Sequence, residues 1–145
     1  MTLRSDHVWQ IAVGEQPPSV LPADLASVKV GMALGLPTID ALVADGTNVG
    51  PVKYCLTHHQ LVVPVEADTI HRWGAAHSNC VSAARSRTCD AGGYRGCSGL
   101  WVTRPSADLA ALTPAGALHE ALSLTRARLR MAPGSYSQHR EARCA

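Results

Sequence analysis

Cysteine and histidine occur in two short, related patterns in the middle of the sequence. Cys55 and His58 are separated by two residues, and His77 and Cys80 repeat this spacing in reverse order after 18 intervening residues. Thiolate and imidazole are ligands that zinc prefers, and this spacing allows one turn of chain to present both. The four residues therefore form a predicted zinc site. In the alternative interpretation, Cys55 is a buried strand residue and His58 lies on a hairpin turn.

A second group of residues could support thiol chemistry. Cys89 and Cys97 bracket a glycine-rich stretch and could also replace either histidine as zinc ligands; Arg85, Arg87 and Arg95 lie close to them in sequence. Neighbouring cations favour the thiolate form of cysteine, which is the nucleophile and the redox-active species. A thiol-based sensor or enzyme is therefore one hypothesis, and two ordinary thiols on a loop are the other.

Basic residues also gather on the last helix that the sequence predicts. His119, Ser123, Arg126 and Arg130 follow offsets of four, three and four, so they share one helix face. A second face carries Leu118, Leu122, Thr125 and Leu129, which we expect to pack on a sheet. Together with Tyr94, Arg85, Arg87 and Arg95, the basic face would form a surface that contacts phosphates. The alternative is an ordinary solvated helix face.

Motifs for the common catalytic mechanisms are missing from the sequence. Ser98 lies between Cys97 and Gly99, which does not match the nucleophile elbow with glycine two residues to either side. The chain contains neither a phosphate-binding Gly-Lys-Ser/Thr loop nor a dinucleotide fingerprint. We therefore expect a non-catalytic protein.

Length and composition limit the class of protein further. The chain has 145 residues, which suits one domain, and its formal net charge of +2 is too small to identify a partner. It contains 13 lysines and arginines, nearly all arginine, a bias typical of a GC-rich genome. No apolar stretch approaches the roughly 20 residues needed to span a membrane, so we expect a cytoplasmic protein without membrane contact. Its five cysteines would then remain thiols unless a metal binds them.

The elements that must position these side chains follow from periodicity and from glycine and proline breaks. Strands are predicted at 7–13, 24–30, 51–56, 60–65 and 100–103, and Pro64 should end its strand or place it at an edge. In the alternative interpretation of 24–30, Asp24 caps a short helix. Helices are predicted at 37–44, 66–73 and 114–131. The predicted fold class is α+β, with a small, mainly antiparallel sheet packed against two or three helices. A single domain would span 1–132, with a mobile loop at 82–99 and a disordered tail at 133–145.

Four short segments carry a resemblance to a known family. They are Gly35-Leu36-Pro37, Gly50-Pro51-Val52, Leu61-Val62-Val63-Pro64-Val65 and Trp101-Val102-Thr103-Arg104-Pro105. Over residues 25–130 the chain resembles small actinobacterial proteins that are similar to the N-terminal domain of bifunctional DNA primase/polymerases. The resemblance implies an acidic pair on one strand, which holds divalent metal, and a histidine on a neighbouring strand.

The chain departs from that family at the acidic pair. The corresponding strand is Ser27-Val28-Lys29-Val30, which has no carboxylate, although His59 lies near the expected histidine. Without metal-binding acids, two-metal phosphoryl transfer cannot proceed. The sequence therefore predicts a non-catalytic relative that binds nucleic acid or another protein. A zinc-binding structural or regulatory protein is the alternative.

Overall fold

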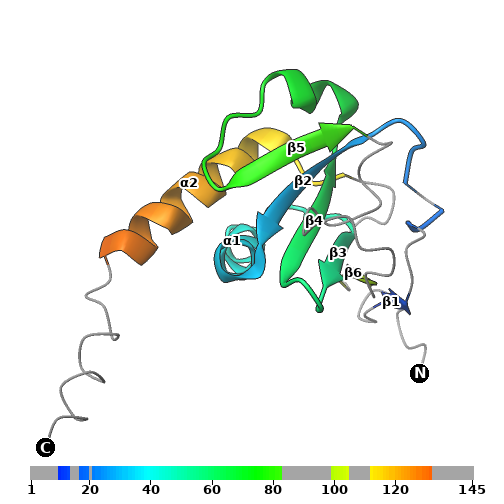
Figure 1. Cartoon of the computed structure of the whole chain (residues 1–145), viewed down its shortest axis with the longest axis horizontal. Helices are drawn as coiled ribbons and strands as arrows, with labels where there is room; N and C mark the ends of the chain where they lie inside the picture. Colours follow the sequence, from blue (N-terminus) through cyan, green and yellow to red (C-terminus); the bar gives the residue numbers. More distant parts are fainter. Residues whose placement is uncertain (1–9, 14–16, 20, 83–98, 105–111, 132–145) are drawn as a thin grey trace, which may run out of the picture.

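Six antiparallel strands form one sheet in the order β1-β6-β3-β4-β2-β5 among the residues that the structure describes (Figure 1). The structure is a computed structural model, and it describes residues 10–13, 17–19, 21–82, 99–104 and 112–131. The strands are β1 (Gln10–Val13), β2 (Ala26–Gly31), β3 (Val52–Cys55), β4 (Gln60–Val65), β5 (Ser78–Ser82) and β6 (Gly99–Thr103). Helices α1 (Met32–Ala44) and α2 (Ala115–Met131) pack against the sheet, and the 3-10 helix η2 (Ala67–His71) follows β4. The predicted fold class is confirmed.

One face of the sheet packs against both helices. Alternation along β2 and β4 directs Val28, Val30, Leu61 and Val63 to this face, and each is at most 3% exposed. The helices contribute Ile39 and Leu42 from α1 and Leu118 and Leu122 from α2 to the same buried cluster. These aliphatic residues form the main core, which has no phenylalanine because the chain contains none.

The opposite face of the sheet carries a different set of side chains. Lys29, Val62, Lys53 and Trp101 are cross-strand neighbours in one row over four strands. Lys29 is 4% and Lys53 is 2% exposed. Lysine stems that lie along apolar surface still contribute packing. Lys53 lies against Gly99, where an added Cβ would be 2.3 Å from the lysine Cε. This face is therefore buried, although neither α1 nor α2 covers it.

Helix α1 begins five residues before the predicted start, at Met32 rather than Pro37. The prediction was wrong because proline is normally excluded from helix interiors. Gly31 supplies no side-chain cap, and the backbone N–H of Met32 instead donates to the His59 carbonyl at 2.8 Å. The Thr38 hydroxyl donates to the Leu34 carbonyl next to Pro37. A long-range hydrogen bond therefore fixes the start of the helix.

Three further predictions about the sheet and its connections need correction. Strand β4 is central although it contains Pro64, which pairs with Ser27 of β2 and lies beyond the last pair with β3. Strand β5 was not predicted, because three of its five residues are serine or asparagine, which have low strand propensity. The predicted helix at 66–73 is the shorter 3-10 helix η2.

The remaining elements agree with expectation. The hairpin of β3 and β4 turns at residues 56–59, β2 is a strand, and α2 spans the predicted segment within one residue. The predicted loop at 82–99 lies largely outside the described residues, and the predicted tail at 133–145 lies wholly outside them. No helix in the described ranges is both long and apolar enough to cross a membrane.

Candidate functional site

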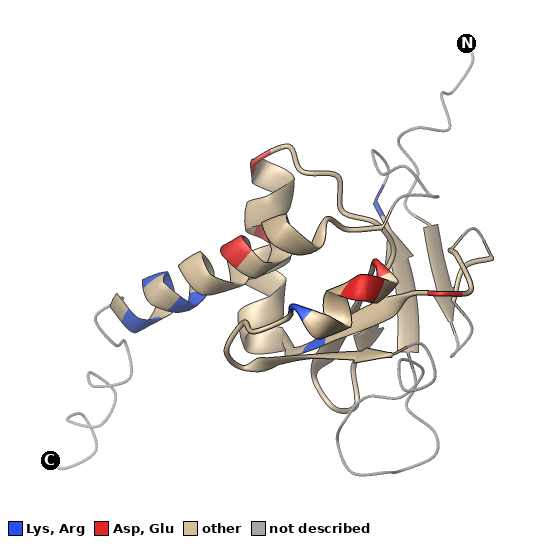
Figure 2. Ribbon diagram, turned by 90° about the horizontal axis from the view of Figure 1, so that it is seen from above, with Lys and Arg blue, Asp and Glu red and all other residues tan. Residues whose placement is uncertain are grey.

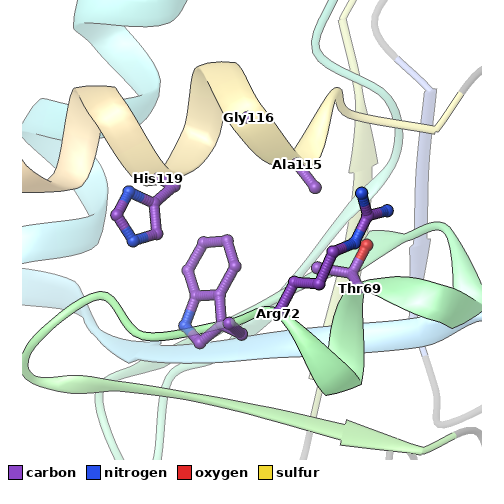
Figure 3. Close-up of a pocket in the computed structure, with 6 residues that line it drawn as sticks. Thr69, Arg72, Ala115, Gly116 and His119 are labelled. Carbon is purple, nitrogen blue, oxygen red and sulfur yellow. The ribbon is translucent and has the colours of Figure 1, made fainter.

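A groove separates η2 from the first turn of α2 (Figure 3). Its inner part has a volume of about 200 Å³ and is lined by Thr69, Arg72, Trp73, Ala115, Gly116 and His119. A wider part of about 580 Å³ shares Thr69, Arg72, Ala115 and Gly116 and extends to Glu66 and Thr113. The two cavities share these four lining residues, and we call them together the α2 groove.

The first turn of α2 presents backbone donors to this groove. The first hydrogen bond of the helix runs from the Leu118 N–H to the Pro114 carbonyl, so the amides of residues 115–117 have no intrahelical acceptor. Thr113, a natural capping residue, instead accepts a hydrogen bond from the Gly50 N–H at 3.1 Å. The first turn contains no acidic residue. The positive end of the helix dipole therefore lacks a negative side chain of its own.

The inner wall of the groove is held rigidly. The Trp73 indole N–H donates to the Ser78 hydroxyl at 2.9 Å, and that hydroxyl donates to the Ala75 carbonyl. The His119 ring meets Trp73 edge to face, with ring centroids 5.3 Å apart and an interplanar angle of 79°. This geometry is favourable for aromatic pairs and fixes His119 at the groove.

A second, shallower hollow lies further along the same helix. It has a volume of about 300 Å³, and it is lined by His77, Arg126 and Arg130 together with Ala33, Leu34 and Leu129. We call it the arginine hollow. Its floor is apolar, and it combines two guanidinium groups with one imidazole from the turn before β5. Figure 2 shows that the basic residues of α2 gather toward its C-terminal end.

Two local features of the arginine hollow stand out. His77 adopts a φ of 59°, in the left-handed region that favours glycine and costs other residues of order 1 kcal/mol or more. The Nε atom of Arg126 is buried and has no hydrogen-bond partner among the described residues. A buried donor without an acceptor is unfavourable.

The predicted basic face is thus divided between two sites. His119 lines the α2 groove, whereas Arg126 and Arg130 line the arginine hollow. Leu129 was predicted to pack on the sheet but is 54% exposed, because the last turns of α2 extend beyond the sheet (Figure 1). The other members of the basic surface, Arg85, Arg87, Tyr94 and Arg95, lie outside the described residues.

The structure does not assemble the predicted zinc site. Cys55 lies on β3 and Cys80 on β5, with two strands between them, and they face opposite sides of the sheet. At about 4.8 Å per strand, this order separates them by roughly 14 Å. His77 faces the arginine hollow instead. Within the described ranges, no three His, Cys, Asp or Glu residues converge to hold a metal, while Cys89 and Cys97 fall outside those ranges.

One thiol–imidazole contact remains from the predicted cluster. Cys55 Sγ lies 3.4 Å from His58 Nδ1, but Cys55 is only 1% exposed. Cys80 is partly buried against the main core, and this burial raises the pKa of its thiol. Both cysteines therefore pack within the fold, with Cys55 buried and Cys80 partly buried.

Alkylation of Cys80 in the native protein should therefore be slow. Because thiolate is the reactive form, the raised pKa and the limited access both reduce the rate relative to the unfolded chain. Peptide mapping after timed iodoacetamide treatment at pH 8, with and without urea, would measure this. We expect a rate at least severalfold lower without urea, and equal rates would contradict the burial described.

Sequence reasoning missed most of the α2 groove. Thr69, Arg72 and Trp73 fall in a short polar segment without a recognised motif, and only the fold places them beside the first turn of α2. One signal was present in the sequence. Thr113-Pro114 is followed by Ala115 and Gly116 without an acidic residue in the first turn, which indicates an uncompensated helix start.

Comparison of the chain with protein-family models, curated proteins and solved structures finds no match.

Proposed function

We propose that the protein is a non-catalytic module that binds nucleic acid through the arginine hollow on α2. The observation that carries the proposal is the convergence of His77, Arg126 and Arg130, from two separate elements, on one apolar hollow. Backbone phosphates are recognised by clustered cations, and apolar surface between the cations accommodates sugars and bases.

The strain at His77 supports the same proposal. Glycine would adopt its φ of 59° without cost, yet a side chain occupies the position and lines the hollow. Strained backbone is tolerated where the surroundings hold it in place, often at binding sites. We therefore propose that His77 belongs to the binding surface.

The chemistry of the strands supports a role without catalysis. None of the six described strands contains Asp or Glu, and β2 carries Ser27 and Lys29 where a metal-binding acidic pair would lie. His59 lies on the exposed turn between β3 and β4, and its backbone carbonyl accepts the hydrogen bond that starts α1. We accordingly propose that the chain is similar to a primase/polymerase N-terminal domain that has lost metal-dependent chemistry.

Replacing Arg126 or Arg130 with alanine is expected to weaken binding to a labelled single-stranded oligonucleotide by about tenfold each, because each loses a charge-assisted hydrogen bond. Fluorescence anisotropy at 50 to 300 mM NaCl would measure the affinity. Each single-strand phosphate contact contributes about 0.7 to the salt slope, so the double variant should lower the slope by about 1.4.

Arg128 provides a matched control on the same helix. It is exposed, carries the same charge, and does not line the hollow. Arg128→Ala should therefore change the affinity much less than Arg126→Ala. Equal losses of affinity from both changes would mean that binding depends on the net charge of the helix and not on the arginine hollow. Absence of binding at 50 mM NaCl would refute the proposal. Binding of an acidic peptide in place of the oligonucleotide would identify a protein partner.

A further inference from the structure

One stripe of α2 lies outside both the α2 groove and the arginine hollow. It consists of Ala117, Glu120, Leu124, Arg128 and Met131, whose offsets of three, four, four and three place them on one helix face. Ala117 is partly buried, and the other four residues are exposed. We call these five residues the α2 stripe, and most of it is accessible to a partner.

The apolar residues of the α2 stripe follow the spacing of helices that pair with another helix. Ala117, Leu124 and Met131 recur every seven residues, which is the heptad repeat of coiled coils. Leu124 is 51% and Met131 is 82% exposed. The C-terminal part of α2 extends beyond the sheet, so no described strand covers this end of the stripe (Figure 1). The spacing therefore indicates a second helix as the partner.

The two charged residues of the α2 stripe point to a second α2 as that helix. Glu120 lies four residues before Leu124, and Arg128 lies four residues after it. At 1.5 Å per residue they are about 12 Å apart along the helix, which is too far for them to pair with each other. Neither forms an ion pair with any other residue that the structure describes. Each therefore carries a charge whose complement is present at the opposite end of the same stripe.

An antiparallel pair of α2 helices would bring these opposite charges together. With a two-fold axis beside Leu124, Glu120 of each copy faces Arg128 of the other copy, and Met131 faces Ala117. Leu124 meets the same residue of the second copy at the centre. The stripe is thus complementary to itself, which is what the interface of a symmetric dimer requires. In a parallel pair, by contrast, Glu120 would face Glu120 and Arg128 would face Arg128, and like charges across an interface are unfavourable.

We infer that a second copy of this chain docks on the α2 stripe, so that the protein forms an antiparallel, two-fold dimer through α2. The inference does not depend on nucleic-acid binding. One helix pair buries less surface than a standard interface, so we expect a weak dimer with a dissociation constant on the order of 100 µM. At protein concentrations well below this value the chain is monomeric, so the Arg128→Ala control for oligonucleotide binding remains valid.

Charge reversal tests the pairing of Glu120 with Arg128. Sedimentation equilibrium of the full chain, at concentrations up to about 1 mM and at low salt, would measure the dissociation constant. Glu120→Arg and Arg128→Glu each place two pairs of like charges in the dimer, so each should weaken self-association by about tenfold or more. An equimolar mixture of the two variants should form a heterodimer at least as tight as the wild-type dimer, because every facing pair is then opposite in charge. The double variant, which keeps the wild-type net charge, should dimerise like the wild-type chain.

Leu124→Ser tests the apolar centre of the α2 stripe. It should weaken the dimer by about tenfold or more, because both copies lose the same contact. Leu56→Ser is the matched control, since Leu56 is 56% exposed on the turn between β3 and β4, and it should leave the dimer unchanged. Circular dichroism should show that both variants are folded, because both leucines are largely exposed in the single chain. A monomer throughout the concentration range would overturn the inference, and so would a dimer that is unaffected by charge reversal or by Leu124→Ser.

Discussion

The double variant Gly35→Ala/Leu61→Ala is expected to lose less free energy of unfolding than the sum of the losses in the two single variants. An added Cβ at Gly35 would lie 2.6 Å from Leu61 Cδ1 and 3.1 Å from Val30 Cγ1. Leu61 is 0% exposed, so its side chain has no solvent-filled space into which to move. Overpacking costs about 1 to 3 kcal/mol, which outweighs the gain of about 1 kcal/mol that alanine brings to a helix interior. Gly35→Ala should therefore be destabilising.

Leu61→Ala alone should lower the free energy of unfolding by about 2 to 5 kcal/mol, because it leaves a cavity in the main core. The same cavity would admit the new methyl group at position 35, so the two changes should couple favourably by about 1 kcal/mol or more. Urea unfolding followed by circular dichroism would measure the four chains of this cycle. Gly116→Ala, where nothing lies within 4 Å of the added Cβ, is the matched control and should not destabilise. Strict additivity would contradict the contact between α1 and β4.

Trp101 is the second position with a large expected effect. It is 6% exposed and packs with Leu21, Leu25 and Leu112, so Trp101→Ala should cost about 3 to 5 kcal/mol. Trp101→Phe should retain most of that stability, because the indole N–H is buried without a hydrogen-bond partner among the described residues. Thermal and urea unfolding of both variants would test this difference.

Trp73 serves as the comparison for this prediction. Its indole N–H does donate to Ser78, so Trp73→Phe should lose a hydrogen bond worth about 1 kcal/mol in addition to its packing. Both Trp→Phe changes remove the same atoms. A large loss at position 101 that matches Trp101→Ala would mean that the Trp101 N–H has an acceptor.

The predictable part of the fold was the part determined by local pattern. The valine-rich alternation of β2 and β4 and the turn at 56–59 identified three central strands, and the spacing of Leu118 and Leu122 identified α2. The start of α1 depends on the His59 carbonyl, 27 residues away in sequence from Met32, and no local rule predicts it. Strand β5 forms because β2 offers it a hydrogen-bonding edge, although its own residues are poor strand formers.

In the candidate site, too, the features set by local sequence pattern were predictable and those set by long-range contacts were not. Helical spacing placed Arg126 and Arg130 on one face, and they do line one hollow. His77 was assigned to zinc because of its spacing from Cys80, but His77 lines the arginine hollow and Cys80 packs against the main core. The α2 groove joins residues more than 40 positions apart, so only the tertiary structure brings Thr69 and Gly116 together.

The extension of α2 past the sheet has a consequence for the energetics of recognition. From Ala127 to Met131 every residue is exposed, so these turns have little tertiary packing to hold them (Figure 1). Short helical segments without packing open readily, and Arg126 and Arg130 repel each other across one turn. Local unfolding should therefore begin at this end of the helix. A ligand that neutralises the arginines would also order the backbone beneath them, and part of its binding energy would be spent on that ordering.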